Sequence, residues 1–182
     1  MKKLVIATLM MCVTAMSAKA QVLTSETVNN VYETVIHQTN GKYLFNAEWT
    51  GKDLTTMYVY KNVDNRKGMT TLKPHLKYEY AYAADGKLTS RTTFRWNDSQ
   101  DRWTCASRHD YALVGTKYNA EYSRYNIATD SFDLPVEKMV YSLIPDVDVN
   151  YVCCYLRNQK SSDYQLVSET YVTTPSTLIA AK

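Results

Sequence analysis

One Cys/His pair in the sequence is close enough to suggest nucleophilic catalysis. Cys105 precedes His109 by four residues, and a catalytic dyad needs its two side chains within hydrogen-bond reach. If both residues lie on one strand, they share a face but stand roughly 13 Å apart, at about 3.3 Å per residue. No Gly-x-Ser-x-Gly nucleophile elbow occurs either. The sequence therefore predicts no catalytic nucleophile.

Two pairs of carboxylates have the spacing required for glycoside hydrolysis. That reaction uses two carboxyl groups about 5 to 10 Å apart across a cleft. The pairs are Asp98 with Asp101 and Asp130 with Asp133. Both pairs fall in expected hairpin loops, where Asp commonly serves as a solvated turn residue. Turn residues are therefore the preferred interpretation, and a hydrolase requires carboxylates that converge from separate strands.

Metal ligands are sparse. The histidines are isolated, at His37, His75 and His109, and no Cys-x-x-Cys or His-x-x-x-His spacing occurs. Residues 146–150 (Asp-Val-Asp-Val-Asn) match the first half of a calcium loop. The sixth position is Tyr151 instead of Gly and the twelfth is Arg157 instead of Glu, so the loop is incomplete. We predict no metal and no cofactor.

A group of aromatic and polar residues forms a candidate ligand-binding surface. Its members are Arg95, Trp96, Asn97, Trp103, Arg124 and Tyr125. Their rings can stack on sugars, and arginine and asparagine side chains can donate hydrogen bonds to hydroxyl groups. Cross-strand aromatic pairs also stabilise sheets without a ligand, by about 0.2 to 1 kcal/mol each. Packing is therefore the competing interpretation.

These residues belong to an internal repeat. Its order is Arg, aromatic, Asn, three residues, Asp, one residue and a second aromatic; it starts at Arg95 and again 29 residues later at Arg124. Each copy describes a hairpin with a polar loop, because Asn and Asp side chains bond nearby backbone groups. Successive hairpins of about 30 to 40 residues predict an antiparallel meander that forms one long, curved sheet.

Short runs rich in Val, Thr, Tyr, Ile and Trp alternate with turn signals along the chain. This pattern predicts an all-β protein. The clearest hairpin joins residues 77–82 to residues 87–96. Its turn contains Asp85-Gly86, and Asp-Gly readily adopts the positive φ that tight hairpin turns require. Alternating tyrosines give the first of these strands an aromatic face, which suits either the core or an interaction surface.

One segment also fits a helix. Its apolar residues have helical spacing, at Val28, Val31, Tyr32, Val35 and Ile36. Ser25 is a candidate N-cap and Asn40-Gly41 a candidate stop. Val, Thr, Tyr and Ile dominate the segment, and β-branched residues lose rotamer freedom in helices. We predict a strand here, with a helix as the alternative.

Three cysteines follow residue 20, at Cys105, Cys153 and Cys154. In an oxidising compartment they allow one disulfide. Adjacent residues of a strand point to opposite faces, so Cys105 can pair with Cys153 or with Cys154 but not with both. Burial as free thiols is the alternative.

The first twenty residues have the three parts of a secretory signal peptide. Lys2 and Lys3 form a positive segment, residues 4–13 an apolar stretch, and residues 18–20 (Ala-Lys-Ala) a cleavage site before Gln21. The apolar stretch is shorter than the roughly 20 residues of a membrane span. We predict export to the periplasm or the extracellular space, and no membrane span.

Cleavage would also change the charge of the chain. It removes three lysines, so 21 basic residues become 18, equal to the 18 acidic ones, and the net charge falls from +3 to zero. The remaining basic residues are scattered, so nucleic-acid binding is not expected. For residues 21–182 we then predict a single β domain with a thin, aromatic core. Residues 173–182 are expected to form a loose tail at its end.

Residues 77–103 resemble small secreted proteins of Bacteroides and its relatives, the domain of unknown function 3836 family. The motifs that carry the resemblance are Tyr-Glu-Tyr-Ala-Tyr, Asp-Gly-Lys-Leu-Thr-Ser-Arg and Arg-Trp-Asn. The resemblance implies an exported β protein and no established activity. Residues 80–88 also resemble one tyrosine-aspartate hairpin repeat of large shell-forming toxin-delivery proteins, although Ala83 stands where Asp usually follows the second Tyr. This second resemblance implies a hairpin only.

Taken together, the residues predict an exported, non-catalytic interaction or binding module that uses an aromatic and polar sheet surface. A protein or a glycan would be its partner, and the sequence specifies no oligomeric state. The first alternative is a hydrolase of the cell envelope whose carboxylates converge from separate strands. The second alternative is a carbohydrate-binding module.

Overall fold

The computed structural model describes residues 22–38, 41–64, 70–142, 149–158 and 162–173. The predicted signal peptide (1–20), the calcium-loop residues 146–148 and all but the first residue of the predicted tail lie outside the described residues.

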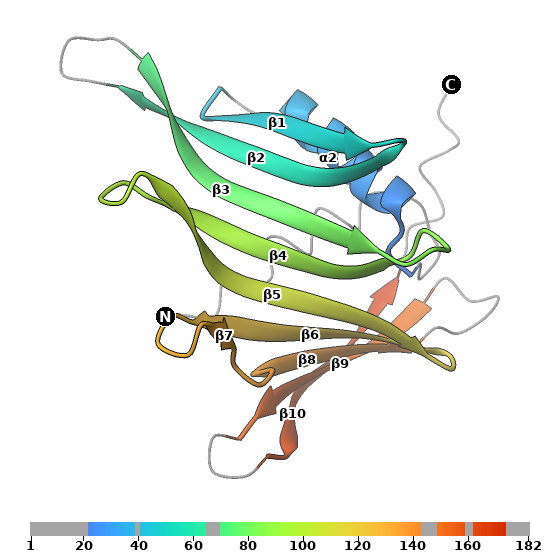
Figure 1. Ribbon diagram of the computed structural model, residues 1–182. Coiled ribbons are helices and arrows are strands. Elements are labelled where there is room, and N and C mark those ends of the chain that lie inside the picture. Colours follow the sequence, from blue (N-terminus) through green and yellow to red (C-terminus); the bar gives the residue numbers. More distant parts are fainter. Residues whose placement is uncertain (1–21, 39–40, 65–69, 143–148, 159–161, 174–182) are drawn as a thin grey trace, which may run out of the picture.

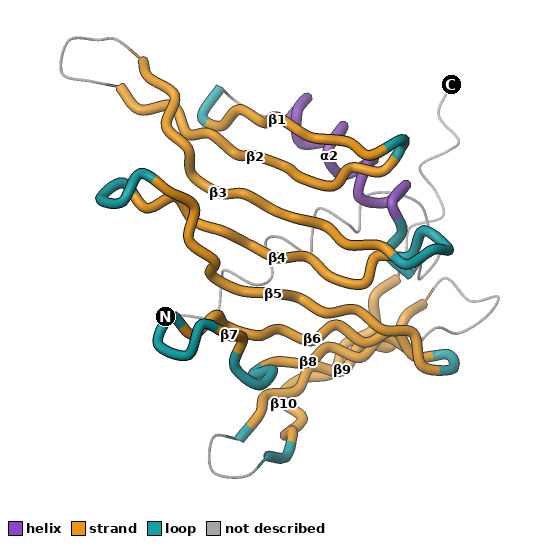
Figure 2. The backbone as a smooth tube through the Cα atoms, viewed as in Figure 1, coloured by secondary structure: helices purple, strands orange, loops and turns teal. Residues whose placement is uncertain are grey.

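The described residues form one ten-stranded antiparallel sheet whose strands follow one another in chain order (Figure 1). Figure 2 shows the same path with helix and strands distinguished by colour. The strands are β1 Tyr43–Thr50, β2 Asp53–Asp64, β3 Thr70–Tyr82, β4 Leu88–Asn97, β5 Arg102–Val114, β6 Lys117–Asn126, β7 Ser131–Phe132, β8 Glu137–Ser142, β9 Val149–Arg157 and β10 Tyr164–Thr173. Both β7 and β8 pair with β6. The prediction of an all-β antiparallel meander is confirmed.

The hairpin predicted from the Asp-Gly turn joins β3 to β4. The two strands pair antiparallel from Leu76 opposite Arg95 to Tyr82 opposite Leu88. Gly86 in the turn has φ +78°, a conformation that costs glycine little because it has no Cβ. The local turn chemistry therefore fixes this pairing.

The strand prediction for the segment around Val28 is wrong, because the chain forms helix α2 (Ser25–Gln38) there. Its N-cap is Thr24 and not Ser25. The Thr24 carbonyl accepts a hydrogen bond from the Val28 N–H at 3.0 Å, and the Thr24 hydroxyl oxygen accepts one from the Thr27 N–H at 3.3 Å. The Thr24 carbonyl thus accepts the first intrahelical hydrogen bond, and the Thr24 hydroxyl satisfies one N–H group, that of Thr27, which the first helical turn leaves without an intrahelical partner.

Burial of the apolar stripe explains why the helix forms despite its β-branched residues. Val28 is buried against the sheet, and Tyr32 and Val35 pack against the same cluster. Most of the stability of a protein helix comes from such packing and not from intrinsic propensity. The contact with the sheet therefore outweighs the unfavourable propensity of the segment.

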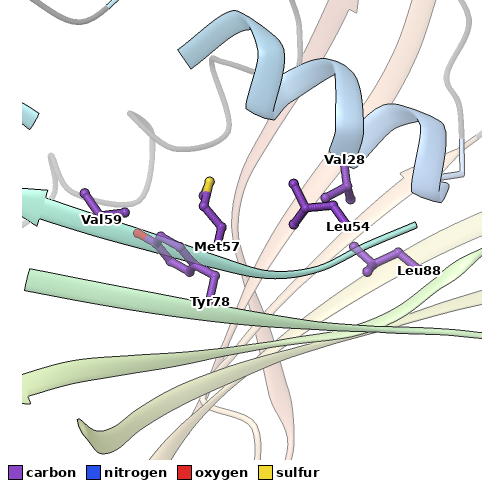
Figure 3. Packing of buried hydrophobic residues seen from close by; sticks show 6 residues of the cluster. All are labelled: Val28, Leu54, Met57, Val59, Tyr78 and Leu88. Atoms are coloured by element: carbon purple, nitrogen blue, oxygen red, sulfur yellow. The ribbon is translucent and has the colours of Figure 1, made fainter. Parts of the chain in front are cut away.

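The main core lies between α2 and the first strands of the sheet (Figure 3). Its buried side chains are Val28, Leu54, Met57, Val59, Tyr78 and Leu88. Partly buried aromatic side chains surround them: Tyr32, Tyr43, Phe45, Tyr80, Tyr82 and Tyr111. The core is one layer thick and rich in tyrosine, so aromatic rings replace the aliphatic side chains that the chain lacks.

The sheet has two different faces. The helix face packs on α2 and carries Leu54, Met57 and Tyr78. The outer face carries the side chains that alternate with these, such as Tyr58 and Lys77, which lie opposite each other on β2 and β3. Apart from strand pairing, the main contacts among the described elements are those of α2 with β1 and β2, on the helix face. No helix in the described part of the chain is long and apolar enough to cross a membrane.

Candidate functional site

Cations on the outer face lie over aromatic rings. The Lys77 Nζ is 4.1 Å from the centre of the Phe94 ring and 2.6 Å from a Glu79 carboxylate oxygen. Only 15% of the Lys77 side chain is exposed. Its aliphatic stem therefore shields apolar surface, while its charge is balanced by the carboxylate.

The same arrangement recurs along the sheet. The Arg108 guanidinium lies 4.4 Å from the centre of the Phe132 ring, and its Nε is 2.9 Å from an Asp110 carboxylate oxygen. Lys138 likewise pairs with Glu121 at 3.1 Å and lies 5.7 Å from the Tyr164 ring centre. Stacked and paired cations therefore cover part of the outer face without giving it a net positive charge.

The first aromatic pair joins Trp96 on β4 to Trp103 on β5. The two residues are directly opposite in the sheet, and their rings meet edge to face, with centres 5.1 Å apart and an interplanar angle of 74°. The Tyr58 ring lies 6.1 Å from Trp103 and extends the cluster towards β2. Edge-to-face contacts are favourable because the positive edge of one ring meets the negative face of the other.

The second aromatic pair joins Tyr125 on β6 to Phe132 on β7. These residues are also directly opposite, with ring centres 5.3 Å apart and the same 74° angle. The two pairs occupy equivalent positions in the internal repeat. The sequence repeat is therefore also a repeat of side-chain geometry.

The loops beside the two pairs have matching conformations. The Asn97 side-chain oxygen accepts a hydrogen bond from the Ser99 N–H at 3.1 Å, and that of Asn126 accepts one from the Ala128 N–H at 3.0 Å. The Asp of each copy has positive φ, +48° at residue 101 and +51° at residue 130. Asn and Asp tolerate these roles because their short side chains bond nearby backbone groups. Each loop thus holds its polar groups in a fixed arrangement.

The structure divides the six predicted site residues between the two faces. Trp96, Trp103 and Tyr125 lie on the outer face, and Asn97 is the last residue of β4, where the first loop begins. Arg95 and Arg124 directly precede outer-face residues, so their side chains point to the helix face. Burial is the main cause of the shifted pKa values of three groups on that face, His75, Tyr78 and Glu137. The Arg95 charge also lowers the pKa of His75 and Tyr78, and the Arg124 charge lowers that of Glu137. The arginines therefore point away from the face that carries the rings.

Sequence reasoning did not identify several outer-face residues, namely Tyr58, Lys77, Phe94, Arg108 and Phe132. Phe132 is the last position of the repeat and is detectable from that pattern. Phe94 lies on β4 two residues before Trp96, so strand alternation also places it on the outer face. Tyr58, Lys77 and Arg108 are placed beside the aromatic residues only by the register of the sheet.

The helix face contains a partly buried polar contact between β4 and β5. The Arg91 Nη2 donates to the His109 Nδ1 at 3.2 Å, and the Tyr122 ring lies 5.0 Å from the His109 ring. Burial, with a smaller contribution from the Arg91 charge, lowers the pKa of His109 to about 3. Because arginine only donates hydrogen bonds, Nδ1 acts as an acceptor and the imidazole is neutral.

Cys105 and His109 do not form a dyad. An irregularity in the β4–β5 ladder, between Thr93 and Phe94, shifts the register by one residue. Cys105 therefore lies opposite Phe94 on the outer face, while His109 lies opposite Arg91 on the helix face. The expectation that the two share a face is corrected. Burial also raises the pKa of the Cys105 thiol, which disfavours the reactive thiolate.

Of the two alternatives for the cysteines, the structure has free thiols at Cys105, Cys153 and Cys154 and not the possible disulfide. Cys105 lies on β5 and the other two on β9, with β6 and β8 between them. Three strand spacings amount to roughly 14 Å, whereas a disulfide needs Cα atoms within about 7 Å. The strand order of the sheet thus keeps Cys105 away from both partners.

The carboxylate pairs are exposed loop residues. Asp98, Asp101, Asp130 and Asp133 are all exposed. In the second loop the Tyr125 hydroxyl donates to Asp130, and the Asn126 side-chain amide donates to Asp133 at 3.1 Å. These two carboxylates therefore stabilise the loop. Within the described ranges, no cluster of three or more His, Cys, Asp or Glu residues has the geometry of a metal site.

Among the hollows in the described part of the molecule, two measure about 300 and 350 Å³. The first is bordered by Leu88, Tyr111 and Tyr118 and contains one carboxylate, that of Asp85. The residues that line the second include no carboxylate. Neither hollow has the two convergent carboxylates that glycoside hydrolysis requires.

Comparison with known proteins identifies a family but no activity. The family of unknown function DUF3836 matches residues 13–143. A crystal structure of a protein of unknown function from Bacteroides fragilis NCTC 9343 is 24% identical, with a TM-score of 0.61 over 75% of this chain and 94% of that chain. This likeness supports the fold. No curated protein matches the chain.

Two further crystal structures of DUF3836 proteins are similar. The one from Bacteroides vulgatus ATCC 8482 is 20% identical over 51% of this chain and 90% of that chain, with a TM-score of 0.46. The one from Parabacteroides distasonis ATCC 8503 is 21% identical over 54% of this chain and 87% of that chain, also with a TM-score of 0.46.

Proposed function

Since the chain belongs to the DUF3836 family, whose function is unknown, we propose that it is an exported, non-catalytic binding module that recognises its partner through the outer face. The observation that carries this proposal is the pair of equivalent aromatic clusters, Trp96 with Trp103 and Tyr125 with Phe132. Aromatic residues are enriched at recognition surfaces because they offer large contact areas at a low entropic cost.

The surroundings of these rings favour binding over catalysis. All four rings are only partly buried, and they lie on the face of the sheet opposite α2. The neighbouring loops are held by side-chain hydrogen bonds, so little conformational entropy is lost when a partner binds. The Asp pairs 98/101 and 130/133 are loop residues, and neither hollow described above is lined by the two carboxylates that the alternative hydrolase would need from separate strands.

Tryptophan fluorescence tests the binding role. The Trp49→Phe variant keeps Trp96 and Trp103 as reporters, because Trp49 lies on the helix face against Tyr32. It is titrated with xylan, polygalacturonate, casein and additional copies of the protein itself. We expect at least one probe to change the fluorescence emission of Trp96 and Trp103. The affinity for that probe should be roughly tenfold lower in Trp103→Ala, which is the usual effect of removing a central aromatic contact.

Two outcomes would contradict the binding role of the outer face. One is unchanged emission with every probe. The other is a probe whose affinity is the same in Trp103→Ala and Tyr125→Ala as in the parent, while circular dichroism shows both variants folded.

Export is tested by the N-terminus of the protein expressed from its full sequence in a Gram-negative host. We expect mass spectrometry to find a chain that starts at Gln21 in the periplasm or the medium, because the small residues Ala18 and Ala20 suit signal peptidase. The Ala20→Tyr variant should keep its first twenty residues. A parent chain that retains Met1 in the cytoplasm would refute export.

A further inference from the structure

We propose that the partner of the outer face is a neutral, linear polysaccharide that lies across β4 to β7 and contacts both aromatic pairs. This inference rests on the proposed binding function and names the class of ligand. Three properties of the outer face support it: the spacing of the pairs, the balance of charge and the fixed polar groups beside the rings.

The spacing of the two pairs suits a ligand with repeating units. Trp96 and Trp103 bridge β4 and β5, and Tyr125 and Phe132 bridge β6 and β7. Across the sheet the pairs are therefore two strands apart, or about 10 Å, on the same face and beside loops at the same end. They are also displaced along the strands, because the register places Arg124 opposite Ser107, four residues beyond Trp103. The sheet thus presents two equivalent aromatic pairs. A polymer with repeating units can contact both pairs at once, whereas a small molecule can contact only one.

The pairing of the outer-face cations disfavours an acidic polymer. Lys77 and Arg108 are the cations that stack on rings beside the aromatic pairs, and Glu79 and Asp110 pair with them at 2.6 and 2.9 Å. An acidic polysaccharide or a nucleic acid would have to displace these carboxylates before it could use the cations. A neutral chain leaves both ion pairs intact.

The chemistry beside the rings suits sugars. The C–H surfaces of a pyranose can stack on aromatic rings, while its hydroxyl groups need donors and acceptors in fixed positions. The first loop supplies the Asn97 amide, which donates to the Gln100 side-chain oxygen at 3.2 Å. The second supplies the Tyr125 hydroxyl, bonded to Asp130. Each ring pair therefore has polar groups beside it that are already ordered.

The experiment is isothermal titration calorimetry with oligosaccharides of defined length from xylan, mannan and mixed-linkage β-glucan. For at least one series, a hexasaccharide should bind at least tenfold more tightly than a disaccharide, because only the longer chain spans both pairs. Trp103→Ala and Tyr125→Ala should each reduce hexasaccharide affinity to about the disaccharide value. Trp49→Phe, on the helix face, should leave it unchanged, and polygalacturonate should not bind.

A second set of variants keeps the test valid if an alanine variant fails to fold. Trp103→Phe and Tyr125→Phe retain a ring at each pair, and we expect them to keep more than a third of the hexasaccharide affinity. Equal affinity for both lengths would overturn the two-pair geometry, and tight binding of polygalacturonate would overturn the neutral ligand.

The outcomes also separate this inference from the binding role itself. If no neutral polysaccharide binds but casein or self-association depends on Trp103, the glycan inference fails and the binding role remains. If no probe depends on Trp103 or Tyr125, both proposals fail.

Discussion

Replacement of Leu54 by alanine is expected to lower the free energy of unfolding by about 2 to 5 kcal/mol. Leu54 is fully buried, with 0% of its surface exposed, and Figure 3 shows it between the strand and Val28 of α2. The substitution removes the contacts of the leucine side chain and leaves a cavity at the junction of the helix and the sheet. Urea denaturation followed by circular dichroism measures the loss.

Leu72→Ala is the matched control, because Leu72 is 52% exposed near the start of β3. We expect its free energy of unfolding to change by no more than about 0.5 kcal/mol. Trp49 contacts Tyr32 of α2, so its fluorescence reports whether the helix leaves the sheet before the strands separate. Equal losses in Leu54→Ala and Leu72→Ala would show that the interface under α2 is not the main core.

The elements that the sequence predicted correctly are those fixed by local chemistry. Asp85-Gly86 specifies the β3–β4 turn without reference to the rest of the chain. The repeat that starts at Arg95 and at Arg124 likewise contains its own loop residues, and the structure gives both copies the same ring geometry. Hairpins of this kind place each strand beside its neighbour in sequence, so a meander follows from local signals alone.

Helix α2 was missed because its stability is not local. Its residues have poor helix propensity, and what stabilises the helix is the burial of Val28 against Leu54 and Leu88, which lie 26 and 60 residues further along the chain. The 3.6-residue spacing of the apolar stripe was the available signal. The burial of this apolar stripe against the sheet outweighs the poor helix propensity of the individual residues.

The candidate site was predictable only in part. Strand alternation alone places the side chains of Arg95 and Trp96 on opposite faces of the sheet. A single surface that combines the aromatic rings with the arginines was therefore inconsistent with strand geometry. The separation of Cys105 from His109 was not predictable, because it depends on a register shift near Phe94. Such a shift is a property of two strands and leaves no pattern in either one.

A second large effect is expected from the partly buried His109 on the helix face. Its folded-state pKa is about 3, against 6.5 for an ordinary histidine. The groups that face it are the Arg91 guanidinium at 3.2 Å and the rings of Tyr111 and Tyr122. Protonation would place a second positive charge beside Arg91 and remove the acceptor that Nδ1 provides. The folded protein therefore resists the proton that the unfolded chain accepts.

This difference makes stability depend on pH in a defined direction. Between about pH 6.5 and pH 3 the unfolded state binds the additional proton, so acidification favours unfolding. We expect His109 to contribute a loss of roughly 1.4 kcal/mol for each pH unit across the central part of this range. Urea denaturation at pH 7, 6, 5 and 4 measures the slope.

His109→Gln tests the assignment, because glutamine offers an oxygen acceptor to Arg91 and does not titrate. Its stability should fall less steeply than that of the parent between pH 6 and pH 4. His37→Gln should keep the parent slope, because the His37 side chain is 77% exposed on α2. If His109→Gln and the parent lose stability in parallel, the acid sensitivity arises elsewhere. If the slopes diverge as expected, the Arg91–His109 contact joins β4 to β5 only while the imidazole is neutral.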